Sequence, residues 1–256
     1  MKALPKVTAE DVQKITENIR KAVEGTGCAG VVLGLSGGID SAVVAKLCAD
    51  AIGADNVLCV FMPSRVTPAG DYQITSDLCK KWGTEYRILD VQPAVDSLTA
   101  ILTATTDTHE DKGNIIARCR MIVLYNLARK HSRVVMGTSN ESEMRIGYFT
   151  KFGDGACDIS PLAGIYKTQV RQIARMINIP EKIIKRKPSA GLWEDQTDEA
   201  EIGMTYDVLD PILFSIMNGS GDEEISKASG VPADTVAAIR ARIKNTEHKR
   251  MLPLTP

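Results

Sequence analysis

Glycine, serine and aspartate are concentrated in one short segment that follows an apolar run at 31–33. The segment consists of Gly34, Leu35, Ser36, Gly37, Gly38, Ile39, Asp40 and Ser41, and a helix-like stretch follows it. The first amide N–H groups of a helix lack partners within the helix and lie at the positive end of its dipole, so they bind anions. Adjacent glycines let a phosphate approach the backbone, serines donate hydroxyl hydrogen bonds, and an aspartate can ligate Mg²⁺. The segment therefore predicts a phosphate-binding loop.

Two common nucleotide-binding motifs are absent from this loop. It lacks the lysine of G-x-x-x-x-G-K-[ST] and the spacing of G-x-G-x-x-G, which disfavours a Walker-type NTPase and a dinucleotide-fold dehydrogenase. A glycine turn capped by Asp40, with no ligand, is the ordinary alternative. The pattern Ser-Gly-Gly-x-Asp-Ser resembles the pyrophosphate loop of the N-type ATP pyrophosphatases. Members of that group cleave ATP to AMP and pyrophosphate and thereby adenylate a carboxylate or carbonyl oxygen.

A second group of polar residues follows the strand expected at 133–136. The stretch 137–161 is rich in Gly, Asp, Ser and Thr without periodicity, which is typical of a functional loop. Because ligands of a parallel sheet bind at the carboxyl ends of its strands, this stretch should face the glycine loop. We expect Glu143 and Asp154 to join Asp40 there, with Mg²⁺ to neutralise the carboxylates. Lys167 would neutralise the charge of a leaving pyrophosphate, although each residue alone could be an ordinary surface or turn residue.

The elements that must position these residues alternate between strands and helices. Apolar runs predict strands at 31–33, 57–62, 86–89 and 133–136. Helical periodicity predicts a first helix from the N-cap Thr8 to about 25–27 and further helices at 41–51, 72–82 and 113–130. This alternation predicts an α/β fold with a doubly wound, mainly parallel sheet flanked by helices. A helical C-terminal part is expected from segments at about 168–178, 198–218, 222–229 and 232–246, with an irregular stretch at 187–197.

Composition narrows the class of protein. The 256 residues include 31 Lys and Arg, 32 Asp and Glu, and 44% hydrophobic residues, which is typical of a globular protein. A net charge of −1 gives no overall attraction for nucleic acid, and we interpret the basic run 182–187 as a solvated surface. No apolar run suits a membrane span, and residues 1–6 do not resemble a signal peptide, so we expect a cytoplasmic protein. The six cysteines form no C-x-x-C pair and are expected to be reduced.

The segment 137–168 closely resembles the corresponding segment of the NAD synthetases. Upstream, Lys112, Gly113, Asn114, Ile115, Ala117, Arg118, Arg120, Met121 and Tyr125 resemble the substrate-binding helix of that family. Downstream, residues 188–210 resemble its mobile loop and the helix after it, and His248, Lys249, Arg250 and Pro253 match its C-terminal signature. The resemblance implies the ammonia-dependent short form, an adenine-nucleotide alpha-hydrolase-like fold, and a single synthetase domain over 1–256 without a glutaminase domain.

The family reaction uses ATP as co-substrate and Mg²⁺ as cofactor to convert the nicotinate carboxylate of deamido-NAD into an acyl-adenylate. Ammonia then attacks the acyl carbon, which gives NAD and AMP, as the last step of NAD biosynthesis. The resemblance also implies a homodimer, with no nucleic-acid or membrane partner. A separate glutaminase subunit that delivers ammonia is the less favoured alternative.

Individual roles follow from the same resemblance. The expected catalytic residues are Asp40, Asp154, Asp158 and Lys167. The expected ATP-binding residues are Gly34–Ser41, Thr138, Lys167 and Ser189. The expected deamido-NAD-binding residues are Asn114, Arg118, Lys151, Asp154, Asp158, His248 and Lys249. Asp40 and Glu143 are expected to bind Mg²⁺, Asp154 should lie near the nicotinate ring, and Asp154 or Asp158 would take a proton from ammonium.

Two positions depart from the family pattern. The loop 61–65 reads Phe-Met-Pro-Ser-Arg, as in glutamine-dependent members, so Arg65 either replaces an ATP-binding arginine or is an exposed loop residue. Asp195 occupies a position where the family has glycine. Competing interpretations are another adenylating enzyme, such as a tRNA-modifying ligase or a GMP-type amidotransferase module, and a module that senses nucleotide without chemistry. The second would not need Glu143, Lys167 or the 188–197 loop.

Overall fold

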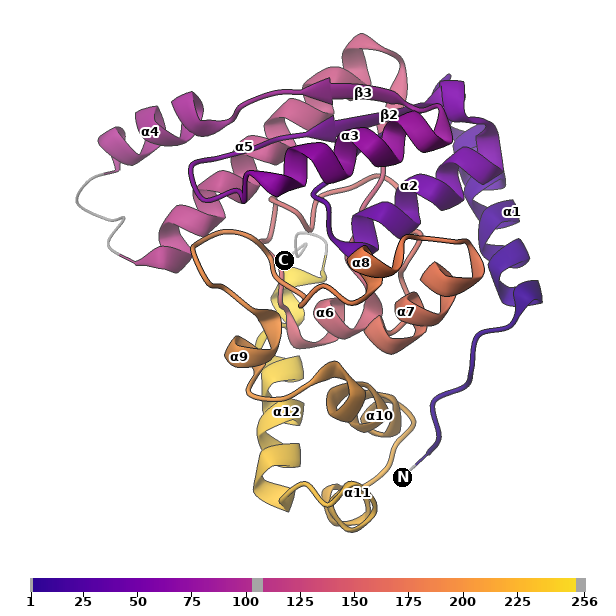
Figure 1. The fold of residues 1–256 in the computed structure, drawn as a ribbon. Coiled ribbons are helices and arrows are strands. Elements are labelled where there is room, and N and C mark those ends of the chain that lie inside the picture. The colour runs from indigo at the N-terminus through magenta and orange to yellow at the C-terminus, as the bar shows by residue number, and fades with distance from the viewer. Residues whose placement is uncertain (1, 103–107, 252–256) are drawn as a thin grey trace, which may run out of the picture.

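Four parallel strands form the sheet, in the order β3-β2-β1-β4 (Figure 1). The computed structural model describes residues 2–102 and 108–251. The strands are β1 (Gly30–Gly34), β2 (Val57–Phe61), β3 (Glu85–Ile88) and β4 (Arg133–Val135). Val32 of β1 lies in register with Leu58 on one side and with Val135 on the other. The chain thus builds the sheet outward from β1 to β3 and then returns to the opposite side of β1, which confirms the doubly wound parallel sheet predicted from the sequence.

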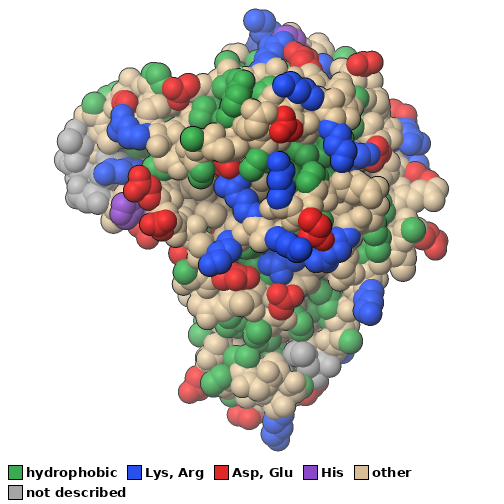
Figure 2. Space-filling model, viewed as in Figure 1, with side chains coloured by type: hydrophobic (Ala, Val, Ile, Leu, Met, Phe, Trp, Pro, Cys, Tyr) green, Lys and Arg blue, Asp and Glu red, His purple; other side chains and the backbone are tan. Residues whose placement is uncertain are grey.

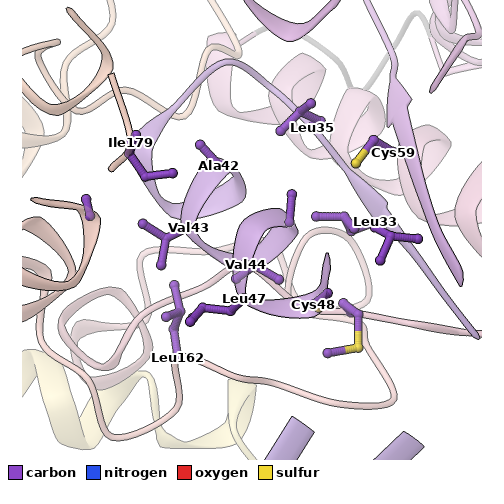
Figure 3. Packing of buried hydrophobic residues seen from close by; sticks show 14 of the residues in the cluster. Leu33, Leu35, Ala42, Val43, Val44, Leu47, Cys48, Cys59, Leu162 and Ile179 are labelled. Carbon is purple, nitrogen blue, oxygen red and sulfur yellow. The ribbon is translucent and has the colours of Figure 1, made fainter. Parts of the chain in front are cut away.

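Neighbouring residues of the central strand point into two different cores. Val31 and Leu33 contribute to a core that α2 dominates, which Figure 3 shows around Leu33, Val44 and Leu47, whereas Val32 contributes to a core on the opposite face. The first face is covered by α1 (Ala9–Thr26), α2 (Ile39–Ile52), α3 (Gly70–Trp82) and α7 (Lys167–Met176). The second face is covered by α4 (Gln92–Ile101) and α5 (His109–Lys130). Burial on both faces explains why the central strands are apolar throughout.

A third core belongs to the helical C-terminal part, which lies below the sheet layer in Figure 1. Tyr206, Leu213, Ile225 and Val236 are fully buried in it. The helices of this region are α6 (Glu141–Ile146), α9 (Asp198–Ile202), α10 (Tyr206–Met217), α11 (Asp222–Ser229) and α12 (Ala233–Asn245). The short helix α8 (Glu181–Ile184) instead packs Ile183 and Ile184 into the first core. The short 3-10 helices η1 (Ala54–Asn56) and η2 (Glu247–Lys249) complete the described elements.

Several helices differ from the sequence-based expectation. The helix expected over 198–218 is two helices, because Gly203 ends α9 in the left-handed conformation at φ 83°. The sequence analysis did not predict α4 or α8, and α6 lies inside the stretch expected to be irregular. Short helices show no reliable periodicity. The six-residue α6 depends instead on a capping box, in which Asn140 and Glu143 bond each other's backbone N–H groups.

Two expectations from composition can be compared with the structure. All six cysteines have free thiols, and Cys48, Cys59, Cys79 and Cys119 are buried. Within residues 2–102 and 108–251, no helix combines the length and the apolar character that crossing a membrane requires.

A buried carboxylate fixes α6 and α7 relative to α10. Asp210 of α10 is fully buried and accepts hydrogen bonds from Ser142 Oγ at 2.6 Å, Thr168 N at 2.8 Å and Thr168 Oγ1 at 2.7 Å. Burial raises the pKa of Asp210, whereas these donors act to lower it. Ser142 adjoins Glu143 and Thr168 adjoins Lys167, so Asp210 positions two helices that carry candidate site residues.

Replacement of Asp210 by alanine should destabilise the fold far more than the same change at Asp207 on the same helix. Asp210→Ala leaves the buried Ser142 and the partly buried Thr168 donors without their acceptor, and we expect a loss of about 2–4 kcal/mol in the free energy of unfolding. Asp207 is 72% exposed and pairs with Arg171 at 3.0 Å, so Asp207→Ala should cost about 0–1 kcal/mol. Urea unfolding followed by circular dichroism measures both values. Equal losses would contradict the bridging role of Asp210.

Candidate active site

The strand order reverses between β1 and β4, and both strands end at the same edge of the sheet. The glycine loop leaves β1 at this edge, and residues 136–140 leave β4 beside it. In doubly wound sheets, ligands bind where the order reverses. A cavity of about 780 Å³ lies there, lined by both loops, by residues 65–68 and by residues 186–198. Its volume suits a ligand of nucleotide size.

The glycine loop is held by its own serines and one left-handed glycine. Gly37 adopts φ 85°, a conformation that side chains rarely allow. Ser36 Oγ accepts a hydrogen bond from Gly38 N at 3.2 Å and lies 3.1 Å from Ser41 Oγ, which bonds Gly38 O. Among the described residues, no side chain caps the N-terminus of α2. Its first N–H groups are therefore available to an anion at the cavity wall.

Lys167 joins the two loops through buried ion pairs. Its Nζ lies 2.6 Å from Asp40 Oδ2 and 3.1 Å from Glu143 Oε1, and only 3% of the Lys167 side chain is exposed. Asn140 donates from Nδ2 to Asp40 Oδ1 at 2.9 Å and from its backbone N to Glu143 Oε2 at 3.2 Å. The structure thus brings together Asp40, Glu143 and Lys167, which sequence reasoning placed in one site. We refer to these three side chains with Asn140 as the lysine cluster.

The carboxyl groups around Lys167, those of Asp40, Glu143 and the nearby Asp198, outnumber its single positive charge. Burial raises the pKa of Glu143 to about 8, and the nearby Asp40 and Asp198 add to this rise although Lys167 opposes it. Burial alone would lower the pKa of Lys167, but the three carboxylates outweigh it and hold that pKa above its ordinary value. Lys167 is therefore charged at neutral pH, whereas Glu143 keeps its proton until the pH approaches 8. A cation bound beside Asp40 and Glu143 would favour the ionised form of Glu143 and so replace this proton.

Asp40 and Glu143 fit Mg²⁺ by their chemistry and position. Both offer hard oxygens beside the phosphate-binding loop, and Mg²⁺ is commonly held by one or two carboxylates together with substrate phosphates. Across the described part of the chain, no three His, Cys, Asp or Glu side chains are grouped as a metal-binding set. The residues therefore fit an ion that is completed by a bound nucleotide rather than one held by protein alone.

Tyr206 and Asp198 connect the lysine cluster to the wall of the cavity. Lys167 Nζ lies 5.2 Å from the centroid of the Tyr206 ring, and Tyr206 OH donates to Asp198 Oδ2 at 3.0 Å. The backbone N–H of Asp198 bonds Pro188 O at 3.0 Å, which closes the loop between these two residues at its base. Asp195 in this loop adopts φ 56°, so the position where the resemblance expects glycine has a glycine-like backbone.

The predicted ATP-binding residues outside the glycine loop also face the cavity. Thr138, Lys167 and Ser189 line it, together with Asp154. Arg65 reaches its rim, where 73% of its side chain is exposed and its guanidinium pairs with Asp96 at 3.2 Å. Without ligand, Arg65 is therefore an exposed loop residue at the rim of the cavity.

The other predicted dinucleotide-binding residues lie outside the cavity lining, around the turn 147–154. Thr150 Oγ1 donates to Asn114 Oδ1 at 2.8 Å, and Arg118 Nη2 donates to Lys151 O at 3.4 Å. Lys151 Nζ donates to His248 O at 2.6 Å. Lys249 Nζ donates to Gly147 O at 2.8 Å and to Phe149 O at 2.9 Å. These contacts join α5 and the C-terminal signature to one turn.

Asp154 and Asp158 have different surroundings. Asp154 opens onto the cavity and accepts a hydrogen bond from Thr150 N at 2.9 Å; desolvation by the surrounding protein nevertheless raises its pKa. Asp158 Oδ2 accepts a hydrogen bond from Val135 N at 2.8 Å, and Oδ1 accepts one from Tyr125 OH at 3.3 Å. Asp154 is thus placed to meet a ligand in the cavity, whereas Asp158 ties its loop to β4.

Asn140 was missed by the sequence reasoning although a signal for it exists. The spacing Asn-x-x-Glu at 140–143 is a capping pattern that precedes a short helix. The structure shows that the same asparagine also bonds Asp40, one hundred residues earlier in the chain. The Asn140 side chain therefore both caps α6 and connects the loop after β4 to the glycine loop.

Comparisons of the sequence and of the structure with known proteins match the same family. The sequence model of the family described as NAD synthase matches residues 11–253. A relative from Pyrococcus horikoshii named NH(3)-dependent NAD(+) synthetase is 44% identical over 247 residues, which cover 96% of this chain and 95% of the relative. The structure of NMN synthetase from Francisella tularensis matches with a TM-score of 0.85 and 36% identity, covering 96% and 97% of the two chains. An NH3-dependent NAD synthetase from Campylobacter jejuni matches with a TM-score of 0.80, 29% identity and 96% coverage of both chains.

The raised pKa of Glu143 predicts a pH dependence of stability. Between the ordinary value of 4.5 and about 8, the folded protein holds a proton that the unfolded chain releases, so the free energy of unfolding falls as pH rises through this window. Glu143→Gln removes the titrating group, so the free energy of unfolding of this variant should not fall for this reason as pH rises. Without Mg²⁺, the variant should gain about 2–4 kcal/mol relative to the unmodified protein between pH 5 and pH 8.5.

Urea unfolding at the two pH values measures this gain. Glu181→Gln is the matched control, since Glu181 is 56% exposed at the surface. The control should show the same small difference at both pH values. A Glu143→Gln difference that does not change with pH would contradict the assigned electrostatics.

Proposed function

The chain belongs to the NAD synthase family, and we propose on this basis that it is an ammonia-dependent NAD⁺ synthetase that amidates the nicotinate carboxylate of deamido-NAD. Its activity is that of a ligase that uses ATP and forms a carbon–nitrogen bond. The lysine cluster beside the glycine loop carries the structural argument, because it supplies cation and metal-ligating groups where the strand order reverses. We propose that residues 1–256 act as one synthetase domain with free ammonia as the nitrogen donor.

The first half-reaction is adenylation. The glycine loop and the N-terminus of α2 would bind the phosphates of ATP, with Thr138 and Ser189 at the cavity wall. Asp40 and Glu143 would hold Mg²⁺, which neutralises charge on the phosphates when it is bound. The nicotinate carboxylate attacks the α-phosphorus and the bond to the β-phosphate oxygen breaks. Lys167 stabilises the negative charge that this step places on pyrophosphate.

The second half-reaction is amide formation. Ammonia must be neutral to attack the acyl carbon, so a base must take one proton from ammonium. Asp154 opens onto the cavity, and its raised pKa makes its carboxylate a stronger base than an ordinary aspartate. The attacking nitrogen then loses one more proton to solvent, the bond from the acyl carbon to the phosphate oxygen breaks to release AMP, and the acyl carbon keeps the nitrogen as an amide. Asp158 would act by holding the loop that carries Asp154 against β4.

The contacts around the turn 147–154 support a binding site for deamido-NAD at this turn. Asn114, Arg118, Lys151, His248 and Lys249 all reach this turn or its neighbours, and Asp154 closes it. A dinucleotide at the turn would place its nicotinate end at Asp154 and the cavity. Deamido-NAD is therefore proposed to enter beside α5 while ATP occupies the glycine loop.

The assembly is proposed to be a cytoplasmic homodimer without a nucleic-acid or membrane partner. Ile122 on α5 is 58% exposed although it is a large hydrophobic residue, and α1 and α5 are the proposed interface helices. Burial of such a side chain against a second copy would remove apolar surface from water.

A mononucleotide acid is the second candidate substrate. The structural match to NMN synthetase from Francisella tularensis, at 36% identity and a TM-score of 0.85, favours it. The same adenylation and amide chemistry would then act on nicotinate mononucleotide. The curated relatives at 42–44% identity are named for NAD⁺ and favour the dinucleotide.

Purified protein with ATP, Mg²⁺, ammonium and deamido-NAD should form NAD⁺ and AMP. A dehydrogenase-coupled assay measures NAD⁺, and chromatography identifies the nucleotide product. Parallel reactions replace deamido-NAD with nicotinate mononucleotide and ammonium with glutamine. We expect the highest kcat/KM with deamido-NAD and ammonium. Preference for the mononucleotide would establish the second candidate, and no ATP–pyrophosphate exchange with either acid would contradict the adenylation.

Lys167→Ala should lower kcat by roughly 10²–10³-fold, because it removes a charge that stabilises the developing pyrophosphate in a buried site. ATP–pyrophosphate exchange should fall in parallel with overall amidation. Lys80→Ala is the control, since Lys80 is exposed on α3, and it should leave kcat unchanged. A Lys167→Ala enzyme with full exchange but slow amidation would contradict the assigned step.

A further inference from the structure

The basic run 182–187 is not uniform. Lys182, Lys185 and Lys187 are exposed, as the sequence interpretation of a solvated surface expects. Arg186 differs, because its Nη1 and Nη2 lie 2.6 Å and 3.0 Å from the two carboxylate oxygens of Asp71. The Asp71 side chain is 8% exposed and the Arg186 side chain is 33% exposed. The interpretation of a solvated surface is therefore wrong for Arg186, which forms a two-pronged ion pair with a buried partner.

This ion pair lies against the glycine loop. A Cβ built on Gly37 would lie 3.4 Å from Arg186 Nη1 and 3.6 Å from Asp71 Cγ. Both side chains line the same cavity as Ser36, Gly38 and Asp40. Figure 2 shows Lys and Arg side chains gathered across the middle of this face, where Figure 1 places α8 and the segment after it.

The charge of Asp71 explains why an arginine is needed there. A buried carboxylate next to the glycine loop would repel a phosphate that binds at Gly37. A guanidinium has five N–H groups, and the pair with Asp71 engages two of its nitrogens. The remaining N–H groups can donate to phosphate oxygens, and the carboxylate fixes the plane of the guanidinium. A lysine could not hold both partners in this geometry.

We propose that Arg186 binds the β- and γ-phosphates of ATP, and then the leaving pyrophosphate, and that Asp71 is the residue that positions it. This inference rests on the proposed adenylation. Two cations then reach the pyrophosphate from different elements. Lys167 comes from the start of α7 and contacts Asp40, whereas Arg186 comes from the segment that follows α8 and lies beside Gly37. Arg186 also directly precedes the 187–197 stretch. Its ion pair with Asp71 therefore also fixes the start of that loop.

Arg186→Gln tests the proposal, because glutamine can still bond Asp71 but carries no charge. We expect the KM for ATP and the inhibition constant of pyrophosphate each to rise roughly tenfold or more. Inhibition by AMP and the KM for deamido-NAD should change little, since neither ligand carries the β- and γ-phosphates. Lys185→Ala is the matched control from the same run; Lys185 is 78% exposed, and its removal should leave all four constants unchanged.

Asp71→Asn tests the positioning role. It should raise the KM for ATP and the inhibition constant of pyrophosphate less than Arg186→Gln does, and Arg186→Lys should restore only part of the lost affinity. Unchanged constants for ATP and pyrophosphate in Arg186→Gln, with only a lower unfolding midpoint, would show that the pair merely packs α3 against the segment after α8. Weaker AMP inhibition alone would also overturn the proposal. Absence of exchange in the unmodified enzyme would instead contradict the proposed function.

Discussion

The buried ammonium group of Lys167 is the interaction on which the site depends. It pairs with Asp40 at the start of α2 and with Glu143 in α6, so one cation connects the loops that leave β1 and β4. An unpaired ammonium with 3% exposure would be costly to bury, and removal of its partners would separate those loops. Asp210 adds a second constraint, because it bonds the residues next to Glu143 and Lys167. The helical C-terminal part therefore acts as the support that holds a charged group in place at the edge of the sheet.

The same arrangement disfavours ionisation of Glu143 in the protein without ligand. Three carboxyl groups lie around one ammonium, and the raised pKa of Glu143 means that one of them keeps a proton at neutral pH. A divalent cation with bound phosphates would add positive charge near the carboxylates and negative charge near the glycine loop and Arg186. Such a complex would favour the ionised form of Glu143, which the protein without ligand disfavours. Stability without ligand is lower for the same physical reason that binding is favoured.

Sequence reasoning succeeded where the signal was local or topological. The glycine loop follows from residue types over eight positions, and the contact between Asp40, Glu143 and Lys167 follows from the rule that ligands lie where the strand order reverses. It failed for α6 and α8, which are too short for periodicity, and at Gly203, where one left-handed residue divides a helical pattern. Asp71 and Arg186 lie 115 residues apart, so no spacing in the sequence indicates that they pair. Such contacts depend on how α3 and α8 pack.

The proposed function assigns the chemistry and the choice of substrate to different parts of this fold. In the proposed reaction the glycine loop and the lysine cluster would act on phosphate and carboxylate groups, which a mononucleotide acid and a dinucleotide acid share. The turn 147–154, with α5 and the C-terminal signature around it, is where the two acids would differ. A structure named for NMN and one named for NAD both match the chain over 96% of its length, with TM-scores of 0.85 and 0.80. Because the backbone is shared over nearly the whole chain, discrimination between the two acids must be sought in side chains, and those that reach the turn are the first candidates.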